Sequence, residues 1–404
     1  MVKARSIRNA TRIDYMVVFF LVVISDACYW FESSGDETFN IVRFAFLFVF
    51  PFFLLFKYHP LINKKGVAVV GSMSAIILLS SFINNGRIKG GDITLIFTLL
   101  SAFLVACVYE GNKFFLLYRN VILFLTGYSL FLWLFVAVGI ITPHSVYNIA
   151  SAHLKSFGGC LFNGDGFLTR NFSIFREPGV FSFFLCSSFM LECAQERRLQ
   201  WKRLLLYVLG ILTTFSTGGI LVFLLLIISK MFLDKSSSNF FFGAFLIIAI
   251  MIALPFVPDI QELVFGKLSD EDNVSRIARL SSFTIPINII IKNPIFGCGL
   301  DNFADIYIRQ GGFLAFDVGV GSATNTILNA TAVWGFVMAL FYLLSYWRFT
   351  KILSGSSFKR IIFFVCFMAL LSNEDLRFTM MTYIFPFIAI VQLNTNKNEY
   401  SYFM

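Results

Sequence analysis

Residues 121–141 read VILFLTGYSLFLWLFVAVGII and contain no Asp, Glu, Lys or Arg. A helix needs about 20 predominantly apolar residues to cross the hydrocarbon core of a bilayer, so this stretch has the length and composition of a membrane span. Residues 39–56 read FNIVRFAFLFVFPFFLLF and have the same character, with a single Arg. Two such runs in one chain indicate that the fold is built within a membrane.

The composition of the whole chain leads to the same class of protein. Of 404 residues, 58% are hydrophobic and 14% are charged, and the mean hydropathy is +0.79. Soluble domains average roughly 45–50% apolar and about 25% charged residues. These values exclude a single soluble domain, a disordered tail, a disulfide knot and a fibrous protein. With 53 Phe, the chain does not fit an outer-membrane barrel either.

The predicted fold class is therefore an all-α polytopic integral membrane protein, with residues 1–404 forming one polytopic domain. The apolar runs predict about twelve transmembrane helices, at about 14–31, 39–56, 66–82, 93–109, 119–141, 179–194, 203–217, 219–233, 239–257, 324–346, 360–372 and 377–393. No cleavable signal peptide is expected, because Arg5, Arg8 and Arg12 lead into a long first span without a small-residue cleavage site.

The positions of Lys and Arg predict the orientation. With the N-terminus inside, 20 of the 32 basic residues fall in inner segments and 11 in outer segments, while Arg43 lies within a span. Cytoplasmic segments carry the excess of basic residues, so both termini are expected in the cytoplasm. The net charge of +9 reflects this bias, and no nucleic-acid partner is expected.

Two outer segments are long, at about 142–178 and 258–323. Long ordered loops in compact proteins are usually functional. We expect both to contain short helices and to lie on the outer side of the membrane.

The first long loop ends in Arg176-Glu177-Pro178, directly before an apolar span. Pro is favoured in the first turn of a helix, so Arg176 and Glu177 are expected at a helix N-terminus. Free N–H groups and the helix dipole attract anions there, and an adjacent Arg would suit a phosphate or pyrophosphate. The alternative is an interfacial Arg–Glu pair that only anchors the helix.

Arg276 and Arg279 in the second loop are three residues apart and share a helical face. Such a pair can hold phosphate oxygens, although a solvated face of an amphipathic helix has the same pattern. Gly297 and Gly299 allow either a tight structural turn or close approach of the backbone to a ligand. Asn325 at the mouth of a span either faces a cavity or caps the helix.

Other polar residues have simpler interpretations. Asp26 and Arg43 lie within spans, where they either pair with each other or reach the interface. Residues 373–377, which read NEDLR, are expected to form a solvated turn. The seven Cys show no metal-ligand spacing, so no metal and no cofactor is expected. Cys160 and Cys298 both fall in the long loops, where a disulfide is one alternative.

Taken together, these features resemble the bacterial O-antigen polymerase and ligase superfamily, and more closely a Wzy-type O-antigen polymerase. Arg176 to Gly179 resembles the family's Arg-Glu-Pro element, and residues 294–299, PIFGCG, resemble its Pro-x-x-Gly-x-Gly element. Residues 216–219, STGG, resemble its Ser-Arg-Gly turn with Thr217 in place of Arg. Thr324 precedes Asn325 where the family has His-Asn.

The resemblance implies a glycosyltransferase of the bacterial inner membrane that acts in lipopolysaccharide biosynthesis. Such an enzyme joins undecaprenyl-pyrophosphate-linked oligosaccharide units at the periplasmic face and releases undecaprenyl pyrophosphate. Its expected partners are these lipid-linked substrates, membrane lipid and a chain-length regulator protein.

The reaction needs cations for the pyrophosphate and a base for the acceptor hydroxyl. We expect Arg176, Arg276 and Arg279 to bind pyrophosphate. Glu177 is the first candidate for the base and Asp301 the second. Asn325, Gly297 and Gly299 are expected to contact the glycan or to form turns.

Two other functions have to be separated from polymerisation. A ligase of the same superfamily shares the fold and the donor, but the ligase branch uses a loop His where this chain has Thr324. A flippase would also have about twelve spans, but it should carry charges within its spans and an inverted repeat.

Overall fold

The computed structural model describes residues 10–31, 37–147, 153–195, 199–233, 274–313 and 323–392. Within these ranges the chain is mostly helical. The α-helices are α1 (Arg12–Val23), α2 (Glu37–Tyr58), α3 (Lys64–Asn85), α4 (Gly90–Val108), α5 (Gly111–Ala137), α6 (Pro178–Gln195), α7 (Trp201–Thr214), α8 (Thr217–Leu233), α12 (Val274–Lys292), α13 (Leu300–Phe313), α14 (Thr326–Trp334), α15 (Phe336–Leu353), α16 (Ser357–Asn373) and α17 (Met381–Gln392).

Five of the described helices are long and apolar enough to cross a membrane, as judged by length and composition. They are Phe39–Tyr58, Lys64–Asn85, Gly90–Val108, Gly111–Ala137 and Phe336–Leu353. Thr217–Met231 and Met381–Gln392 are shorter apolar helices. The chain is thus a helical multi-pass membrane protein. The total of twelve spans stays a prediction, and the span expected at 239–257 lies outside the described residues.

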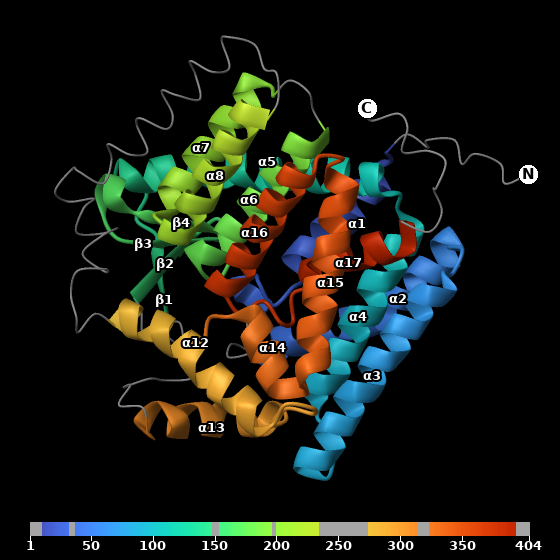
Figure 1. Cartoon of the computed structure of the whole chain (residues 1–404). Coiled ribbons are helices and arrows are strands. Elements are labelled where there is room, and N and C mark those ends of the chain that lie inside the picture. Colours follow the sequence, from blue (N-terminus) through green and yellow to red (C-terminus); the bar gives the residue numbers. More distant parts are fainter. Residues whose placement is uncertain are drawn as a thin grey trace, which may run out of the picture.

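The helices form one bundle with further helices across one end of it (Figure 1). α4 packs against α2, α3 and α17, and α17 continues the contact to α15. α16 joins this part of the bundle to α6 and α8. α12 and α13 lie across the end of the bundle next to α14 (Figure 1).

The outer surface of α2 shows how the bundle meets lipid. Phe44, Phe48, Phe52 and Phe56 follow one another at intervals of four residues and are 41–75% exposed. Residues four apart lie on the same face of a helix, so these rings form one apolar stripe. Lipid is the environment that accepts such a stripe, and this agrees with a membrane location.

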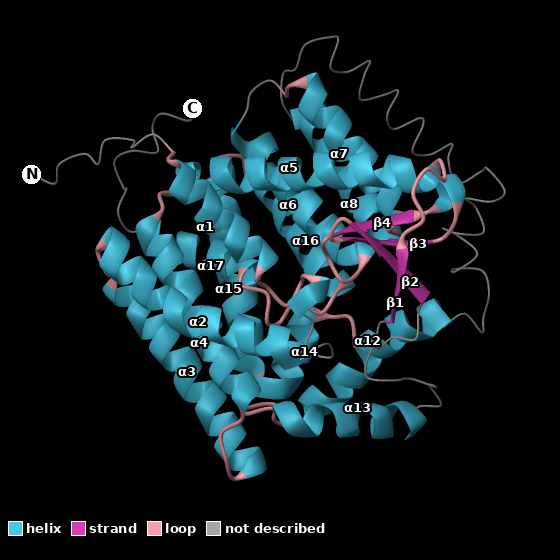
Figure 2. Ribbon diagram, turned by 180° about the vertical axis from the view of Figure 1, so that it is seen from behind, coloured by secondary structure: helices cyan, strands magenta, loops and turns pink. Residues whose placement is uncertain are grey.

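The first long loop differs from the prediction. Its described residues form a four-stranded antiparallel sheet in the order β1-β2-β3-β4, together with the 3-10 turn Gly166–Leu168. The strands are β1 (His144–Tyr147), β2 (His153–Phe157), β3 (Cys160–Asn163) and β4 (Arg170–Ser173). The 3-10 turn is a short helix of the kind expected, but the sheet is not expected: tight turns with glycines at positive φ, such as Gly158 and Gly159, fold the described part of the loop into hairpins. β4 packs on α5, α6 and α7, which attaches the sheet to the bundle (Figure 2).

The expected single span at 324–346 is also wrong. It consists of α14 and α15, separated by Gly335 at φ 91° and ψ 176°. The backbone of residues 294–299 packs into this break: Phe336 N–H donates to the carbonyl of Pro294 at 2.9 Å, and Cys298 N–H donates to the carbonyl of Ala332 at 2.8 Å. The break therefore has hydrogen-bond partners that the local sequence does not reveal.

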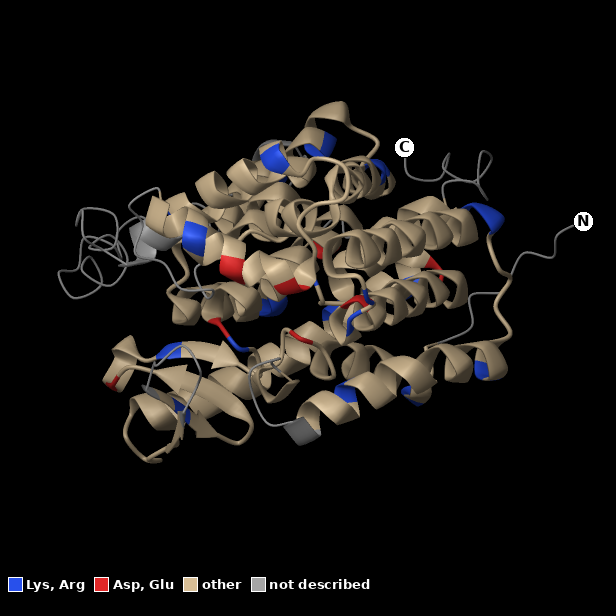
Figure 3. Cartoon of the chain, turned by 90° about the horizontal axis from the view of Figure 1, so that it is seen from below, with Lys and Arg blue, Asp and Glu red and all other residues tan. Residues whose placement is uncertain are grey.

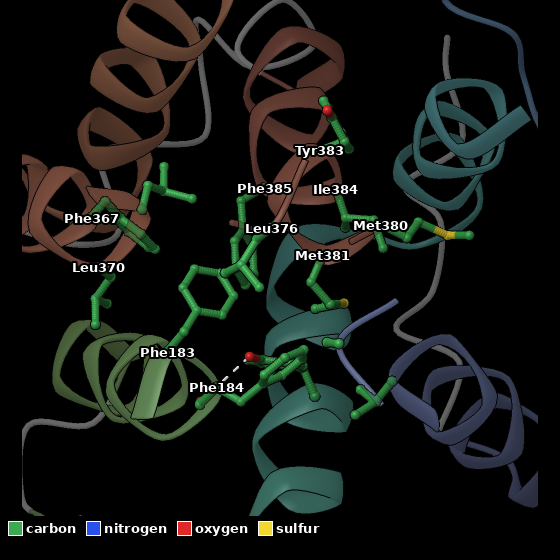
Figure 4. Packing of buried hydrophobic residues seen from close by; sticks show 14 of the residues in the cluster. Phe183, Phe184, Phe367, Leu370, Leu376, Met380, Met381, Tyr383, Ile384 and Phe385 are labelled. Carbon is green, nitrogen blue, oxygen red and sulfur yellow. Dashed lines mark hydrogen bonds between the residues drawn. The ribbon is translucent and has the colours of Figure 1, made fainter. Parts of the chain in front are cut away.

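Aromatic rings fill the centre of the bundle. Phe385 of α17 contacts Tyr118 of α5 at 5.6 Å between ring centroids, Phe349 of α15 at 5.2 Å and Phe367 of α16 at 5.8 Å. Figure 4 shows Phe183 of α6 in the same cluster. Because lipid is as apolar as Phe, these contacts stabilise the bundle mainly through close packing.

The two ends of the bundle carry different polar contacts. At one end Asp14 pairs with Lys113 at 2.8 Å, and Gln392 hydrogen-bonds to Tyr109 and Gly111 at 3.1 Å. These contacts join segments that are predicted to lie in the cytoplasm. The sheet and the residues that follow it lie at the other end, which we call the loop end.

Candidate active site at the loop end

Arg176 lies directly before α6, which begins at Pro178 as predicted. Its Nη1 donates to Asp26 at 3.3 Å, and its Nη2 donates to the backbone carbonyl of Asp375. The Arg176 side chain is only 12% exposed. Arg176 therefore ties the start of α6 to the segment after α1 and to the segment before α17.

Asp26 receives a second cation from α2. Arg43 Nη1 lies 2.6 Å from Asp26 and also donates to the carbonyl of Phe31 at 2.8 Å. This confirms the interpretation in which Asp26 and Arg43 pair with each other. A buried carboxylate between two guanidinium groups keeps its charge satisfied.

Glu177 is exposed, and its carboxyl is hydrogen-bonded to that of Glu374, which is only 7% exposed. Burial raises the pKa of the Glu374 carboxyl well above its usual range. The charge of Glu177 and the hydrogen bond to it also raise the pKa of Glu374. The charges of Arg176 and Arg170 lower this pKa and partly offset the increase. The site thus contains two adjacent carboxyl groups, one accessible and one buried.

Arg170 and Arg279 bring further positive charge to this pair. Arg170 begins β4 and donates from Nε to the carbonyl of Thr214 at 3.3 Å. Burial lowers the pKa of Arg170, the carboxyls of Glu374 and Glu177 raise it, and the charge of Arg279 lowers it. The exposed Arg279 of α12 is therefore close to the cluster. Figure 3 shows acidic and basic positions gathered among the helix ends.

The 373–377 turn is buried, so the expectation of a solvated turn is wrong. Arg377 is 8% exposed and its Nε lies 2.9 Å from both carboxylate oxygens of Asp375. Its guanidinium also lies 4.8 Å from the ring centroid of Phe303 and 6.0 Å from that of Trp334. The turn is buried because the starts of α6 and α14 and the end of α16 meet around it.

For Arg276, the remaining predicted arginine, the structure describes the backbone alone. Arg276 lies in the first turns of α12, and its side chain lies outside the part that the structure describes. Asp301, the second candidate for the base, is on α13 and pairs with Lys89 at the start of α4. Of the two candidates for the base, Asp301 thus has a lysine partner on another element, whereas Glu177 lies close to Arg170.

Gly297 and Gly299 form a structural turn. Both have positive φ, 65° and 78°, and a Cβ on Gly297 would lie 2.3 Å from the carbonyl oxygen of Val333. Asn325 is buried and caps α14, since its side chain accepts from the N–H of Leu328 at 2.9 Å. The structure thus supports the turn alternative for Gly297 and Gly299 and the helix-cap alternative for Asn325.

Arg170 and Glu374 are absent from the sequence-based prediction of the site. Arg170 precedes Arg176 in the same loop, and Glu374 lies in a charged turn at the outer end of a predicted span. A search for charged residues at the ends of predicted spans would have included Glu374, and Arg170 would have required a search of the whole loop. Cys160 and Cys298 are buried free thiols, so the disulfide alternative is not seen.

The comparison with protein families gives a match at residues 204–343, which fit the family described as O-antigen ligase. The match extends from α7 into α15 and includes Arg276, Arg279 and Asn325. It is consistent with the O-antigen polymerase and ligase superfamily, and confirms the resemblance predicted from the motifs. Arg176, Glu177 and Glu374 lie outside the matched residues. A search among curated proteins finds no match to this chain.

Proposed function

We propose that this protein is a polysaccharide polymerase that joins lipid-pyrophosphate-linked oligosaccharide units at the outer face of the inner membrane. The growing chain is transferred from undecaprenyl pyrophosphate to a hydroxyl of the incoming unit. The observation that carries the proposal is the exposed carboxyl of Glu177 beside Arg176, Arg170 and Arg279. The family match supports an enzyme that acts on lipid-linked polysaccharide.

The charges of this cluster suit the reaction. Negative charge grows on the pyrophosphate as the glycosidic bond breaks, and fixed guanidinium groups stabilise that charge. We assign this role to Arg279 and Arg276 of α12 together with Arg176. Arg176 also holds the site together, through Asp26 and the 373–377 turn. Glu177 is the base that accepts the proton of the acceptor hydroxyl.

O-antigen ligation is the second candidate, because the matching family model is described by that activity. A ligase transfers finished chains to lipid A–core, whereas a polymerase acts before that step. Thr324 stands where the ligase branch is expected to have its loop His, and this favours polymerisation.

The lipopolysaccharide of a deletion strain separates these functions. Loss of a polymerase should leave lipid A–core carrying one repeat unit, because single units are still translocated and ligated. Loss of a ligase should leave bare core with long chains on the carrier lipid at the periplasmic face. Loss of a flippase should also leave bare core, with single units stranded on the cytoplasmic face. Bare core that the wild-type gene restores would reject the polymerase.

The polymer has to be identified before the gel is interpreted. If the strain places this polymer in a capsule, the same comparison is made on capsular polysaccharide. Loss of long capsular chains while single lipid-linked units persist outside the cytoplasm would be the matching result.

A further inference from the structure

Asn373 and Glu374, at the end of α16, pack against the first turns of α6 and α8. A Cβ on Gly179, in the first turn of α6, would lie 1.7 Å from Oε1 of Glu374. A Cβ on Gly218, in the first turn of α8, would lie 2.6 Å from Oδ1 of Asn373. Glycines at these two helix starts therefore leave the space into which the end of α16 fits.

Backbone contacts hold the same turn. Thr326 Oγ1 donates to the carbonyl of Glu374 at 2.5 Å, and Arg176 donates to the carbonyl of Asp375. Thr326 is fully buried at the start of α14. These contacts hold the backbone of Glu374 and Asp375, and the first turn of α6 lies directly against the Glu374 carboxyl.

We propose that Glu177 and Glu374 form a carboxyl pair that shares one proton, with the buried Glu374 as a positioning residue that donates its O–H to the exposed Glu177 carboxylate. This inference rests on the proposed polymerase function. Two carboxyl groups in contact cannot both be ionised without strong repulsion, and their protons belong to the pair. In this state the pair carries one negative charge and can accept one proton.

The proton balance of the transfer step follows from this state. The acceptor hydroxyl oxygen forms a bond to the anomeric carbon, and the bond between that carbon and the pyrophosphate oxygen breaks. The hydroxyl proton passes to Glu177, so the pair becomes a neutral diacid. Undecaprenyl pyrophosphate leaves with the bonding electrons, and the arginines stabilise its charge. The pair returns its proton to water before the next cycle.

The pair has to be considered with the charges around it. Arg176 and Arg170 face Glu374, and Glu177 also acts on Arg170, while Arg279 acts on Arg170 from α12. Asp26 neutralises part of the charge of Arg176. Asp375 and Arg377 of the same turn pair with each other. Arg176 and Arg170 stabilise one negative charge on the Glu177–Glu374 pair. Burial of Glu374 disfavours a second negative charge on the pair.

The pair predicts the pH dependence of polymerisation. The pKa of the Glu374 carboxyl is raised by burial and by Glu177, so Glu374 keeps its proton to a higher pH than an exposed carboxyl does and loses it as the pH rises through that pKa. The rate should then fall about tenfold per pH unit, as for loss of one required proton. Glu374→Gln keeps a neutral hydrogen-bond donor beside Glu177 but cannot ionise. Its rate, relative to its own maximum, should lack this alkaline decline.

The experiment is a pH profile of chain extension by the purified full-length protein with lipid-linked repeat units. Glu192→Gln is the matched control, because it removes a buried carboxyl from the other end of α6. The control should decline with pH as the wild type does. A Glu374→Gln profile that keeps the wild-type decline would overturn the pair. So would Glu374→Gln protein that folds normally but is inactive at every pH.

Two further measurements test the pair if the Glu374→Gln variant does not fold. Gly179→Ala should displace an intact Glu374 carboxyl and move the alkaline decline, whereas Gly71→Ala, whose Cβ meets nothing within 4 Å, should not. Infrared titration of the wild type should show a protonated carboxyl that ionises over the range in which the rate falls. Absence of that carboxyl at a pH below the onset of the fall in rate would contradict the pair. If the wild type itself extends no chain, the proposed function has failed instead.

Discussion

Arg279 is exposed, whereas Arg170 and Arg176 of the same cluster are half-buried. Arg279 lies on α12, and its charge reaches Arg170 beside the two glutamates. Loss of one charge-assisted contact is worth about 1.5–3 kcal/mol, which is roughly ten- to a hundredfold in rate. Arg279→Ala should therefore shorten the polymer and slow chain extension by about that factor, at unchanged protein level.

Arg309→Ala is the matched control for Arg279→Ala. Arg309 is another exposed arginine of the second loop, and its Nε donates within α13, to the carbonyl of Asp305 at 3.2 Å. It should leave chain length unchanged. Full-length polymer from a variant with Ala at Arg176, Arg276 and Arg279 together would refute the assignment of these arginines to the pyrophosphate.

Arg377 is expected to act through the stability of the 373–377 turn. Its guanidinium makes a forked contact with Asp375 between the rings of Phe303 and Trp334. Lys keeps the charge but has neither the fork nor the planar stacking surface. Arg377→Lys should destabilise the protein by about 1–3 kcal/mol, seen as a lower thermal unfolding midpoint in detergent. Equal unfolding midpoints for Arg377→Lys and Arg309→Lys would show that neither the forked contact with Asp375 nor the stacking on the two rings contributes to stability.

At the scale of elements, the break between α14 and α15 depends on a backbone shape that only Gly adopts readily. Gly335 combines φ 91° with ψ 176°, and a Cβ there would lie 1.8 Å from the carbonyl oxygen of Ile295. Gly335→Ala should therefore unfold or displace the 294–299 turn and lower the unfolding midpoint strongly.

Gly86→Ala separates backbone strain from overlap. Gly86 ends α3 at φ 65°, but its Cβ would meet nothing within 4 Å. This variant should lose only the strain energy of a left-handed residue, about 1–2 kcal/mol. If Gly335→Ala loses no more stability than Gly86→Ala in the same melting experiment, the turn does not pack into the break as described.

At the scale of the whole molecule, the two ends of the bundle are expected in different compartments. Phe167, 63% exposed beside the sheet, is predicted to lie in the periplasm, and Trp201, 69% exposed at the start of α7, in the cytoplasm. All seven native cysteines are buried, so an added cysteine at the surface can be labelled selectively.

A membrane-impermeant thiol reagent tests this orientation. Phe167→Cys should be labelled in cells whose outer membrane alone is permeable, and Trp201→Cys only after lysis. Unmodified wild-type protein is the control for background labelling. The reverse pattern would invert the predicted topology and place the candidate active site in the cytoplasm.

The sequence by itself determined the class of the protein and the local starts of its elements. Runs such as residues 39–56 identify membrane helices, because lipid requires about 20 apolar residues with internally satisfied backbone groups. Pro178 marks the start of α6, because Pro is favoured in the first turn of a helix, where its missing N–H costs no hydrogen bond. The motif order around Arg176, Arg279 and Asn325 also indicated the superfamily that residues 204–343 match.

Only the tertiary structure decided which charges meet. Glu374 reaches Glu177 because glycines at two helix starts admit the end of α16, and these contacts join segments far apart in the chain. The break at Gly335 exists because the 294–299 turn supplies its hydrogen bonds. Local patterns report the hydrophobicity and backbone preferences of neighbouring residues. They carry no information on which helix ends pack together, and that packing buries the turn that completes the candidate site.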